Sequence, residues 1–151
     1  MISTTNINEA RKQIQKLKKQ DSKQLIIVQA QSPEFNRKIF ENPEVDIITD
    51  LEIHNRKDYL KQRDSGLNEI LCKLATKNNI KIGINLQQLT KLEKKQKAIV
   101  LSRIIQNIKL CKRTKTDIIV FPKDKYSKQE ITSFLLSLKA STNQAKQASE
   151  G

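Results

Sequence analysis

The segment from residue 63 to residue 86 constrains the fold most, because its apolar spacing changes halfway along. Apolar residues first recur at the three-and-four spacing of a helix, at Leu67, Ile70, Leu71 and Leu74. They then alternate with polar residues, as in a half-buried strand, at Ile80, Ile82, Ile84 and Leu86. Asp64 or Ser65 is expected to cap the helix. The segment therefore predicts a loop, a helix and a strand, which is half of a β/α repeat.

The same alternation of helix and strand extends along the whole chain. Strands are expected at residues 25–28, 45–48, 80–86 and 117–121. Helices are expected before the first strand and after each strand, with starts near Asn6 or Asn8, Ser32, Asp64, Thr90 and Ser127. The last two starts are predicted capping boxes, at 90–93 and 127–130. A further short helix is expected around residues 58–62.

Alternation of this kind indicates an α/β fold with a parallel sheet and right-handed crossovers. Four or five strands cannot close the eight-stranded barrel that such repeats often build. The sequence therefore predicts either an open sheet or a reduced, incomplete TIM-barrel-like domain whose exposed edges need covering. This single domain is expected over residues 1–139. Residues 140–151 have no large apolar residue and are predicted to form a disordered polar tail.

Membrane and secretory segments are not evident in the sequence. No apolar run reaches the roughly 18 residues that a membrane-spanning helix needs. The N-terminus has no apolar signal region, so a cytoplasmic protein is expected. Cys72 and Cys111 fall on separate predicted helices and are expected to be free thiols.

Positive charge is concentrated in one stretch of the chain. The formal net charge is +13, and residues 65–116 hold twelve Lys and Arg side chains against only two acids, Glu69 and Glu93. A polyanion could bind such a stretch by releasing its counterions. The alternative is that these lysines only keep the protein soluble. We favour a polyanionic partner because so few acids oppose the basic residues.

The residues of a catalytic or metal site are not apparent. There is one histidine, His54, and the three glycines form no phosphate-binding loop. Four acids, at Asp46, Asp50, Glu52 and Asp58, could bind Mg²⁺ weakly, but their spacing fits no known cage. No catalytic residue and no metal ligand is therefore predicted. The residues alone indicate a basic α/β binding protein.

Several stretches also carry a resemblance to a known family. These are residues 45–48, the Arg63-Asp64-Ser65-Gly66-Leu67-Asn68 run with Leu71 and Leu74, and residues 82–86, 103–112 and 117–121. Together they resemble protein component 3 of archaeal ribonuclease P, the family of the human 30-kDa subunit, over roughly residues 24–140. Their order and spacing are more specific than any one of them.

The resemblance implies a barrel-like scaffold related in shape to the polymerase-and-histidinol-phosphatase (PHP-like) metalloenzymes, without their metal ligands. It implies a non-catalytic subunit of the endonuclease that removes the 5′ leader from precursor tRNA. Catalysis and its Mg²⁺ would belong to the RNA. The implied partners are ribonuclease P RNA, protein component 2 (the Pop-five homologue), the other ribonuclease P proteins and, indirectly, precursor tRNA. No membrane is implied.

This chain also departs from the family pattern. It lacks the first one or two strands and the final strand region that the family leads us to expect. Gln87-Gln88 stands where the family often has a basic residue and a proline after the third strand. Phe121-Pro122-Lys123 stands where the family has a turn of small residues. These departures argue against a fully closed barrel. A reduced archaeal version of the family explains them best, and a fragment is the alternative.

Two groups of residues are the predicted sites. The candidate phosphate contacts are Lys73, Lys77, Lys81, Lys91, Lys94, Lys95, Arg103, Lys109, Lys112 and Arg113. The candidate interface residues, which could equally be loop and cap structure, are Arg63, Asp64, Ser65, Gly66, Asn68 and Asn107.

Two rival functions stay open. One is a shortened PHP-like phosphoesterase that uses Asp46, Asp50 and His54. The other is a scaffold that docks a protein along an open sheet edge and never contacts RNA.

Overall fold

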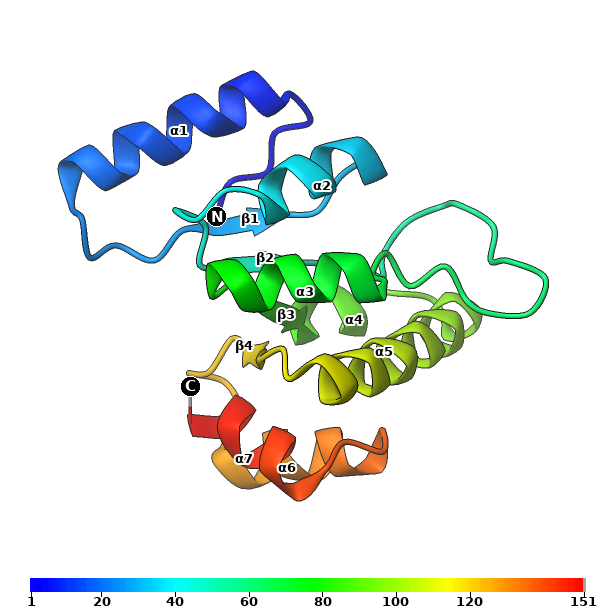
Figure 1. The fold of residues 1–151 in the computed structure, drawn as a ribbon. Helices are drawn as coiled ribbons and strands as arrows, with labels where there is room; N and C mark the ends of the chain where they lie inside the picture. Colours follow the sequence, from blue (N-terminus) through cyan, green and yellow to red (C-terminus); the bar gives the residue numbers. More distant parts are fainter. Residues whose placement is uncertain (151) are drawn as a thin grey trace.

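A computed structural model describes residues 1–150, and its centre is a four-stranded parallel sheet in the order β1–β2–β3–β4 (Figure 1). The strands are β1 (Ile27–Gln29), β2 (Ile47–Thr49), β3 (Lys81–Asn85) and β4 (Ile118–Phe121). Near the N-terminus, Ile2 forms a single parallel bridge with Val28 of β1. Each crossover adds the next strand beside the previous one, which confirms the predicted α/β fold of parallel β/α repeats.

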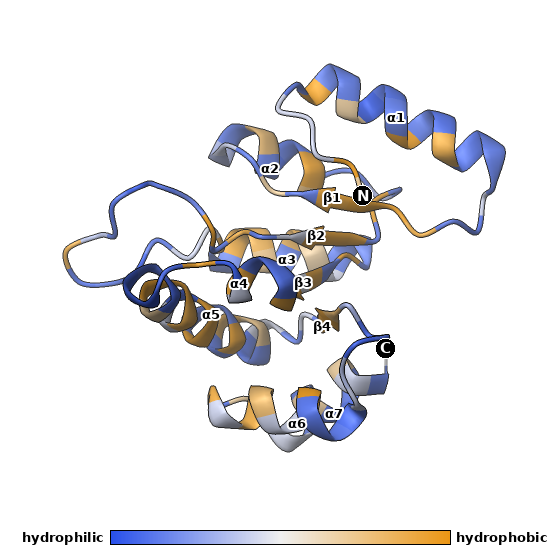
Figure 2. Ribbon diagram, turned by 180° about the vertical axis from the view of Figure 1, so that it is seen from behind, coloured by the Kyte–Doolittle hydropathy of each residue, from blue (hydrophilic) through white to orange (hydrophobic). Residues whose placement is uncertain are grey.

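Within residues 1–150, seven helices contribute to the hydrophobic core around this sheet. They are α1 (Ile7–Gln20), α2 (Pro33–Phe40), α3 (Glu69–Asn78), α4 (Leu86–Thr90), α5 (Lys94–Thr114), α6 (Lys128–Ser137) and α7 (Thr142–Glu150). Figure 1 shows α3 in front of β2 and β3, with α2 and α5 on either side of it. Strand residues Val28, Ile48, Ile82 and Val120 are buried in this core. In Figure 2 the hydropathy colouring marks the strands as apolar and most of the loops as polar.

The opposite side of the sheet contains a hollow of about 460 Å³. Ile27, Ile47, Ile119 and Phe121 line it. The hollow follows from strand alternation, since these side chains point away from the helix-covered face. Within residues 1–150 no strand pairs beyond β4, so the sheet stays open and does not close into a barrel. Helix α7 contacts β4 instead, at the end of the sheet.

Three predicted helix starts are confirmed by their capping contacts. The Asn6 side chain accepts hydrogen bonds from the first turn of α1, and Ser32 accepts one from Phe35 in α2. Ser127 and Glu130 form the predicted capping box of α6. Each cap satisfies N–H groups that have no partner within the helix.

Helix α3 differs from its prediction at its start and on its buried face. Its cap is Asn68, which accepts from the Leu71 amide, and neither Asp64 nor Ser65. The fully buried residues of α3 are Cys72 and Ala75, whereas Ile70 is 60% exposed. Because α2 and α5 both contact α3, close packing selects its small side chains rather than its most apolar ones.

The capping box predicted at residues 90–93 is wrong. Thr90 ends a short helix, α4, which the sequence did not indicate. Helix α5 starts only at Lys94, and the Glu93 before it makes no side-chain capping bond. Asn85, at the end of β3, caps α4 by accepting from the Gln87 amide, so the chain turns into a helix sooner than expected.

The disordered tail predicted from residue 140 is also wrong. Residues 142–150 form α7, and Ala145 and Ala148 are fully buried against the domain. Small residues allow this helix to lie close to its neighbours, so it needs no large apolar side chain. The short helix expected around residues 58–62 is absent as well, because that segment belongs to a long irregular loop. Gly151 lies outside the described residues.

Cys72 and Cys111 are free and buried, as expected for structural thiols. In the described part of the chain, no helix has the length and apolar character needed to span a bilayer.

Candidate nucleic-acid interface

The β2–α3 loop, residues 50–68, is the most prominent irregular segment of the structure (Figure 1). It projects from the carboxyl end of β2, which is the edge where α/β folds usually carry their sites. It begins at Asp50, which has a left-handed backbone with φ 64°. Loops of this length without secondary structure are usually functional when they are ordered.

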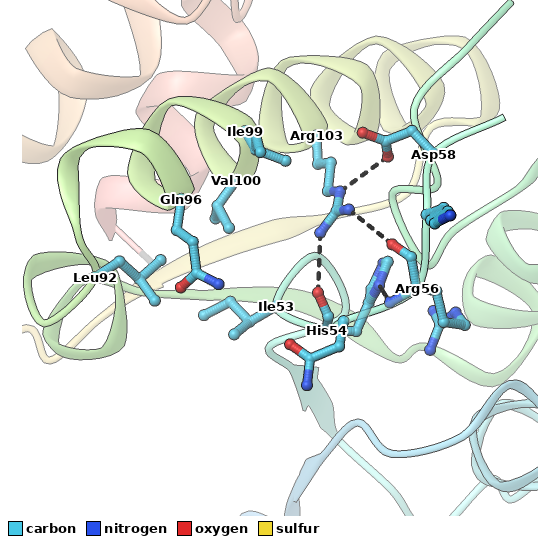
Figure 3. Close-up of a pocket in the computed structure, with 11 residues that line it drawn as sticks. Ile53, His54, Arg56, Asp58, Leu92, Gln96, Ile99, Val100 and Arg103 are labelled. Carbon is cyan, nitrogen blue, oxygen red and sulfur yellow. Dashed lines mark hydrogen bonds and ion pairs between the residues drawn. The ribbon is translucent and has the colours of Figure 1, made fainter. Parts of the chain in front are cut away.

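Arg103 of α5 holds the first half of the loop in place (Figure 3). Its side chain is almost completely buried, and its Nε donates to Asp58 Oδ1 at 3.1 Å. The remaining guanidinium nitrogens donate to the carbonyl oxygens of Glu52, His54 and Arg56, at 3.0 to 3.3 Å. One side chain thus replaces the backbone hydrogen bonds that this part of the loop lacks.

Ion pairs connect the two halves of the loop. Asp58 pairs with Arg63 at 2.8 Å, and Asp64 pairs with Arg56 at 3.0 Å. The Arg63 guanidinium lowers the pKa of Asp58 to about 2. Partial burial raises the pKa of Asp64, but the bonds from Arg56 and from the Gly66 amide outweigh it and lower the pKa overall. Both carboxylates are therefore ionised and neutralised within the loop.

Helix α5 also fixes the second half of the loop. Asn107 Nδ2 donates to the carbonyl of Ser65, and Gln106 Nε2 donates to the carbonyl of Arg63. Gly66 has φ +76°, and a Cβ added there would lie within 2.1 Å of the Leu51 carbonyl oxygen. Only glycine fits this close approach. The predicted Arg63–Asn68 motif is thus one ordered turn that packs on α5.

Glu52 is an isolated carboxylate inside this structure. It is completely buried, and its Oε2 has no hydrogen-bond partner among the described residues. Burial raises the pKa of Glu52 to about 8, and the nearby Asp50 charge adds to the shift. Asp50 itself has a raised pKa, again because of burial. Burial thus favours the protonated form of both acids.

The acids and the histidine do not assemble into a metal site. Asp46 precedes β2, whereas Asp50 and His54 follow it, so the residues of the proposed phosphoesterase lie at opposite ends of the strand. His54 Nε2 lies 2.7 Å from the Asp64 carbonyl oxygen, and burial lowers the pKa of this histidine. Residues 1–150 contain no group of three or more His, Cys, Asp or Glu that could hold a metal ion.

Eight of the ten predicted phosphate contacts are exposed. They occupy α3, the turn before α5, and both ends of α5, at Lys73, Lys77, Lys91, Lys94, Lys95, Lys109, Lys112 and Arg113. Helices α3 and α5 contact each other, so these basic residues lie on neighbouring elements. Lys73 also pairs with Glu69. Contact with RNA stays a prediction for these eight side chains.

The other two predicted contacts lie elsewhere. Lys81 is half-buried beside the hollow on the opposite side of the sheet. Arg103 is only 5% exposed, and the β2–α3 loop occupies its guanidinium. A phosphate would have to displace that loop to reach it. Arg103 is a positioning residue in this structure, and burial of this kind is not visible in a helical charge pattern.

Sequence reasoning overlooked three residues near the loop. Arg37, Arg56 and Tyr59 line a hollow of about 480 Å³ together with the predicted Arg63. Arg37 comes from α2, so it approaches the loop only in the folded chain. The one signal in the sequence was the aromatic Tyr59 among basic residues, Lys57, Lys61 and Arg63.

A solved structure shares this architecture. Over 99% of its length the chain superposes on 62% of a chain from a cryo-EM structure of archaeal ribonuclease P with mature tRNA, with a TM-score of 0.79. Sequence identity in this superposition is 23%, so the likeness shows a shared fold. It supports the reduced TIM-like architecture expected from the sequence.

Sequence relatives point to the same group of proteins. Ribonuclease P protein component 3 of Methanococcus maripaludis strain C7 is 29% identical over 119 residues, which cover 79% of this chain and 47% of the relative. The protein of the same name in Methanosarcina acetivorans is 32% identical, over 66% of this chain and 38% of the relative. The chain thus spans less than half the length of these relatives. Residues 1–126 match the family described as RNase P subunit p30, and the chain belongs to that family.

Proposed function

We propose that this chain acts as a protein subunit of ribonuclease P, the ribonucleoprotein that removes the 5′ leader from precursor tRNA. The observation that carries the proposal is the family match over residues 1–126. The relatives share the name ribonuclease P protein component 3, and the superposed chain comes from a ribonuclease P structure with mature tRNA. Partners would be the RNA, protein component 2 and other subunits in the cytoplasm.

The physical role in this proposal is to offset phosphate repulsion. The exposed lysines and arginines of α3 and α5 would let the catalytic RNA fold and bind its Mg²⁺ at a lower concentration of the ion. In this proposal the chemistry stays with the RNA. The phosphoesterase alternative is not favoured, because β2 separates its candidate residues.

Reconstitution of tRNA processing tests the function directly. We expect omission of this chain from an assembly of the RNA and the other subunits to reduce 5′ leader cleavage strongly at low Mg²⁺. High Mg²⁺ should restore part of the activity, because the ion then screens the phosphates itself. Cleavage measured across a Mg²⁺ series checks this. Full activity at low Mg²⁺ without the chain would contradict the subunit role.

RNA binding should also depend on salt in a residue-specific way. We expect Lys109→Ala and Arg113→Ala each to flatten the slope of log affinity against log salt by about 0.7–0.9. Lys12→Ala on α1, which changes an equally exposed lysine, is the matched control. Affinity for ribonuclease P RNA is measured by filter binding at several salt concentrations. Slopes that none of these variants changes would remove α5 from the interface.

A further inference from the structure

The hollow beside the β2–α3 loop, here called the Tyr59 hollow, has the composition of a ligand site. It measures about 480 Å³, within the range of roughly 300–1,000 Å³ that is usual for small-ligand sites. Pro33, Leu67 and Leu71 supply apolar surface to it. Tyr59 belongs to the same lining and is 62% exposed, although most aromatic side chains of a folded chain are largely buried. An exposed tyrosine ring beside apolar surface can stack against a planar ring of a ligand.

Three arginines from two separate segments meet at the Tyr59 hollow. Arg37 lies on α2, while Arg56 and Arg63 lie in the loop. Each donates one guanidinium nitrogen to a carboxylate, namely Glu41, Asp64 or Asp58. Their other guanidinium nitrogens have no partner within the described chain, so they can donate to an anion. Planar donors of this kind match the oxygens of a phosphate group.

The acids near the Tyr59 hollow do not cancel this preference. Asp64 lines the hollow and Asp58 pairs with its Arg63, and both carboxylates are fully engaged. Asp58 accepts from Arg63, from Arg103 and from the Asp64 amide. Asp64 accepts from Arg56 and from the Gly66 amide. The surface left for a ligand therefore offers an aromatic ring, apolar side chains and the unpaired guanidinium N–H donors.

Amide groups complete the lining. The Gln106 Nε2 donates to Arg63 and Ser65, which fixes the side chain and leaves its Oε1 without a partner in the described chain. Gln62 also lines the hollow and is exposed. An amide beside an aromatic ring can hydrogen-bond the edge of an unpaired base while the ring stacks on its face, and Gln106 is already held in position for this.

We propose that the Tyr59 hollow receives one unpaired nucleotide of a structured RNA. Its base would stack on Tyr59, and its phosphate would lie at Arg37, Arg56 and Arg63. A paired base cannot enter, because both of its faces are covered within the helix. The proposal rests on the proposed function and adds to it a site that discriminates single strands from duplex. The lysines of α3 and α5 would contact the duplex backbone independently.

Two variants of Tyr59 test the proposal in the full chain. The probes are a single-stranded RNA of about ten nucleotides and a blunt duplex of the same length, within the range of single-strand site sizes. Tyr59→Ala should weaken binding of the single strand by about 5- to 100-fold, from the loss of stacking, and leave duplex binding unchanged. Because stacking carries no charge, the salt slope should not change. Circular dichroism should show an unaltered fold, since the side chain is exposed.

Tyr59→Trp supplies a direct optical reading, because the chain contains no other tryptophan. Its fluorescence should be quenched by the single strand and not by the duplex, with affinity kept. Arg37→Ala should reduce the slope of log affinity against log salt for the single strand. Arg11→Ala on α1 is its control and should leave that slope unchanged.

Each outcome has a distinct meaning. Single-strand binding that Tyr59→Ala does not change, with no quenching in Tyr59→Trp, overturns the nucleotide site but not the proposed function. The nucleotide site would also be overturned if Tyr59→Ala kept its RNA binding but lost its binding to another ribonuclease P protein. The Tyr59 hollow would then be a protein interface. If the unaltered chain binds neither probe nor ribonuclease P RNA, both proposals fail.

Discussion

Replacing Arg103 by alanine is expected to destabilise the folded chain by about 3–5 kcal/mol, the usual cost of removing one partner from a buried charged network. The carbonyl oxygens of Glu52, His54 and Arg56 would lose their donor, and Asp58 would lose one of its partners. Urea unfolding at pH 7, followed by circular dichroism, measures the change in the free energy of unfolding. The midpoint should fall while the slope stays similar, unless the loop unfolds first.

Arg113→Ala is the matched control for this experiment. Arg113 lies on the same helix but is exposed, so its replacement should change stability by no more than about 0.5 kcal/mol. Arg103→Lys keeps the charge, but a single ammonium cannot reach all four acceptors, and only partial recovery is expected. A loss below about 1 kcal/mol for Arg103→Ala would show that the β2–α3 loop does not depend on this side chain.

Glu52→Gln should do the opposite and stabilise the chain by about 3 kcal/mol at pH 7, since each pKa unit corresponds to roughly 1.4 kcal/mol. The folded state raises the pKa of Glu52 from 4.5 to about 8, so the folded chain holds the proton more tightly than the unfolded chain. The stability associated with this group is complete below pH 4.5 and falls as the pH rises toward 8. Glutamine has the same shape and never ionises.

Unfolding experiments from pH 4.5 to 8.5 check this second prediction. The two proteins should be almost equally stable at the acid end, and the difference should grow steadily above it. Glu44→Gln, at an exposed acid, is the control and should follow the unaltered chain. Parallel stability curves for the unaltered chain and Glu52→Gln would mean that Glu52 ionises freely, and that water or a partner reaches it.

The resemblance to the ribonuclease P family was recognisable in the sequence because its motifs are local. The Arg63–Asn68 run, the β3 strand and the Arg103–Lys112 run each fit within one element or turn, and the match over residues 1–126 confirms the family. Their chemistry was harder to assign. Arg103 belongs to the same run as the exposed Lys109 and Lys112, yet it is buried against a loop some 45 residues earlier in the chain.

Helix boundaries show where local rules were sufficient. Ser32, Asn6 and Ser127 were correct caps because each satisfies amides within its own first turn. The motif at Thr90 also satisfied the local rule but was wrong, since Asn85 began a helix at the end of β3. Which of two possible helix starts is used depends on where the preceding strand ends. Local spacing does not specify that position.

The sequence by itself determined the β/α repeats, the parallel sheet, the cationic helices and the family, because these follow from periodicity, capping and short motifs. Only the tertiary structure decided three features: that α7 packs with nothing larger than alanine, that Arg103 supports a loop, and that Arg37 meets Tyr59 and Arg63 at one hollow. Each depends on contacts between segments far apart in the chain. Burial and charge pairing at such contacts are set by packing, and packing is a property of the whole fold.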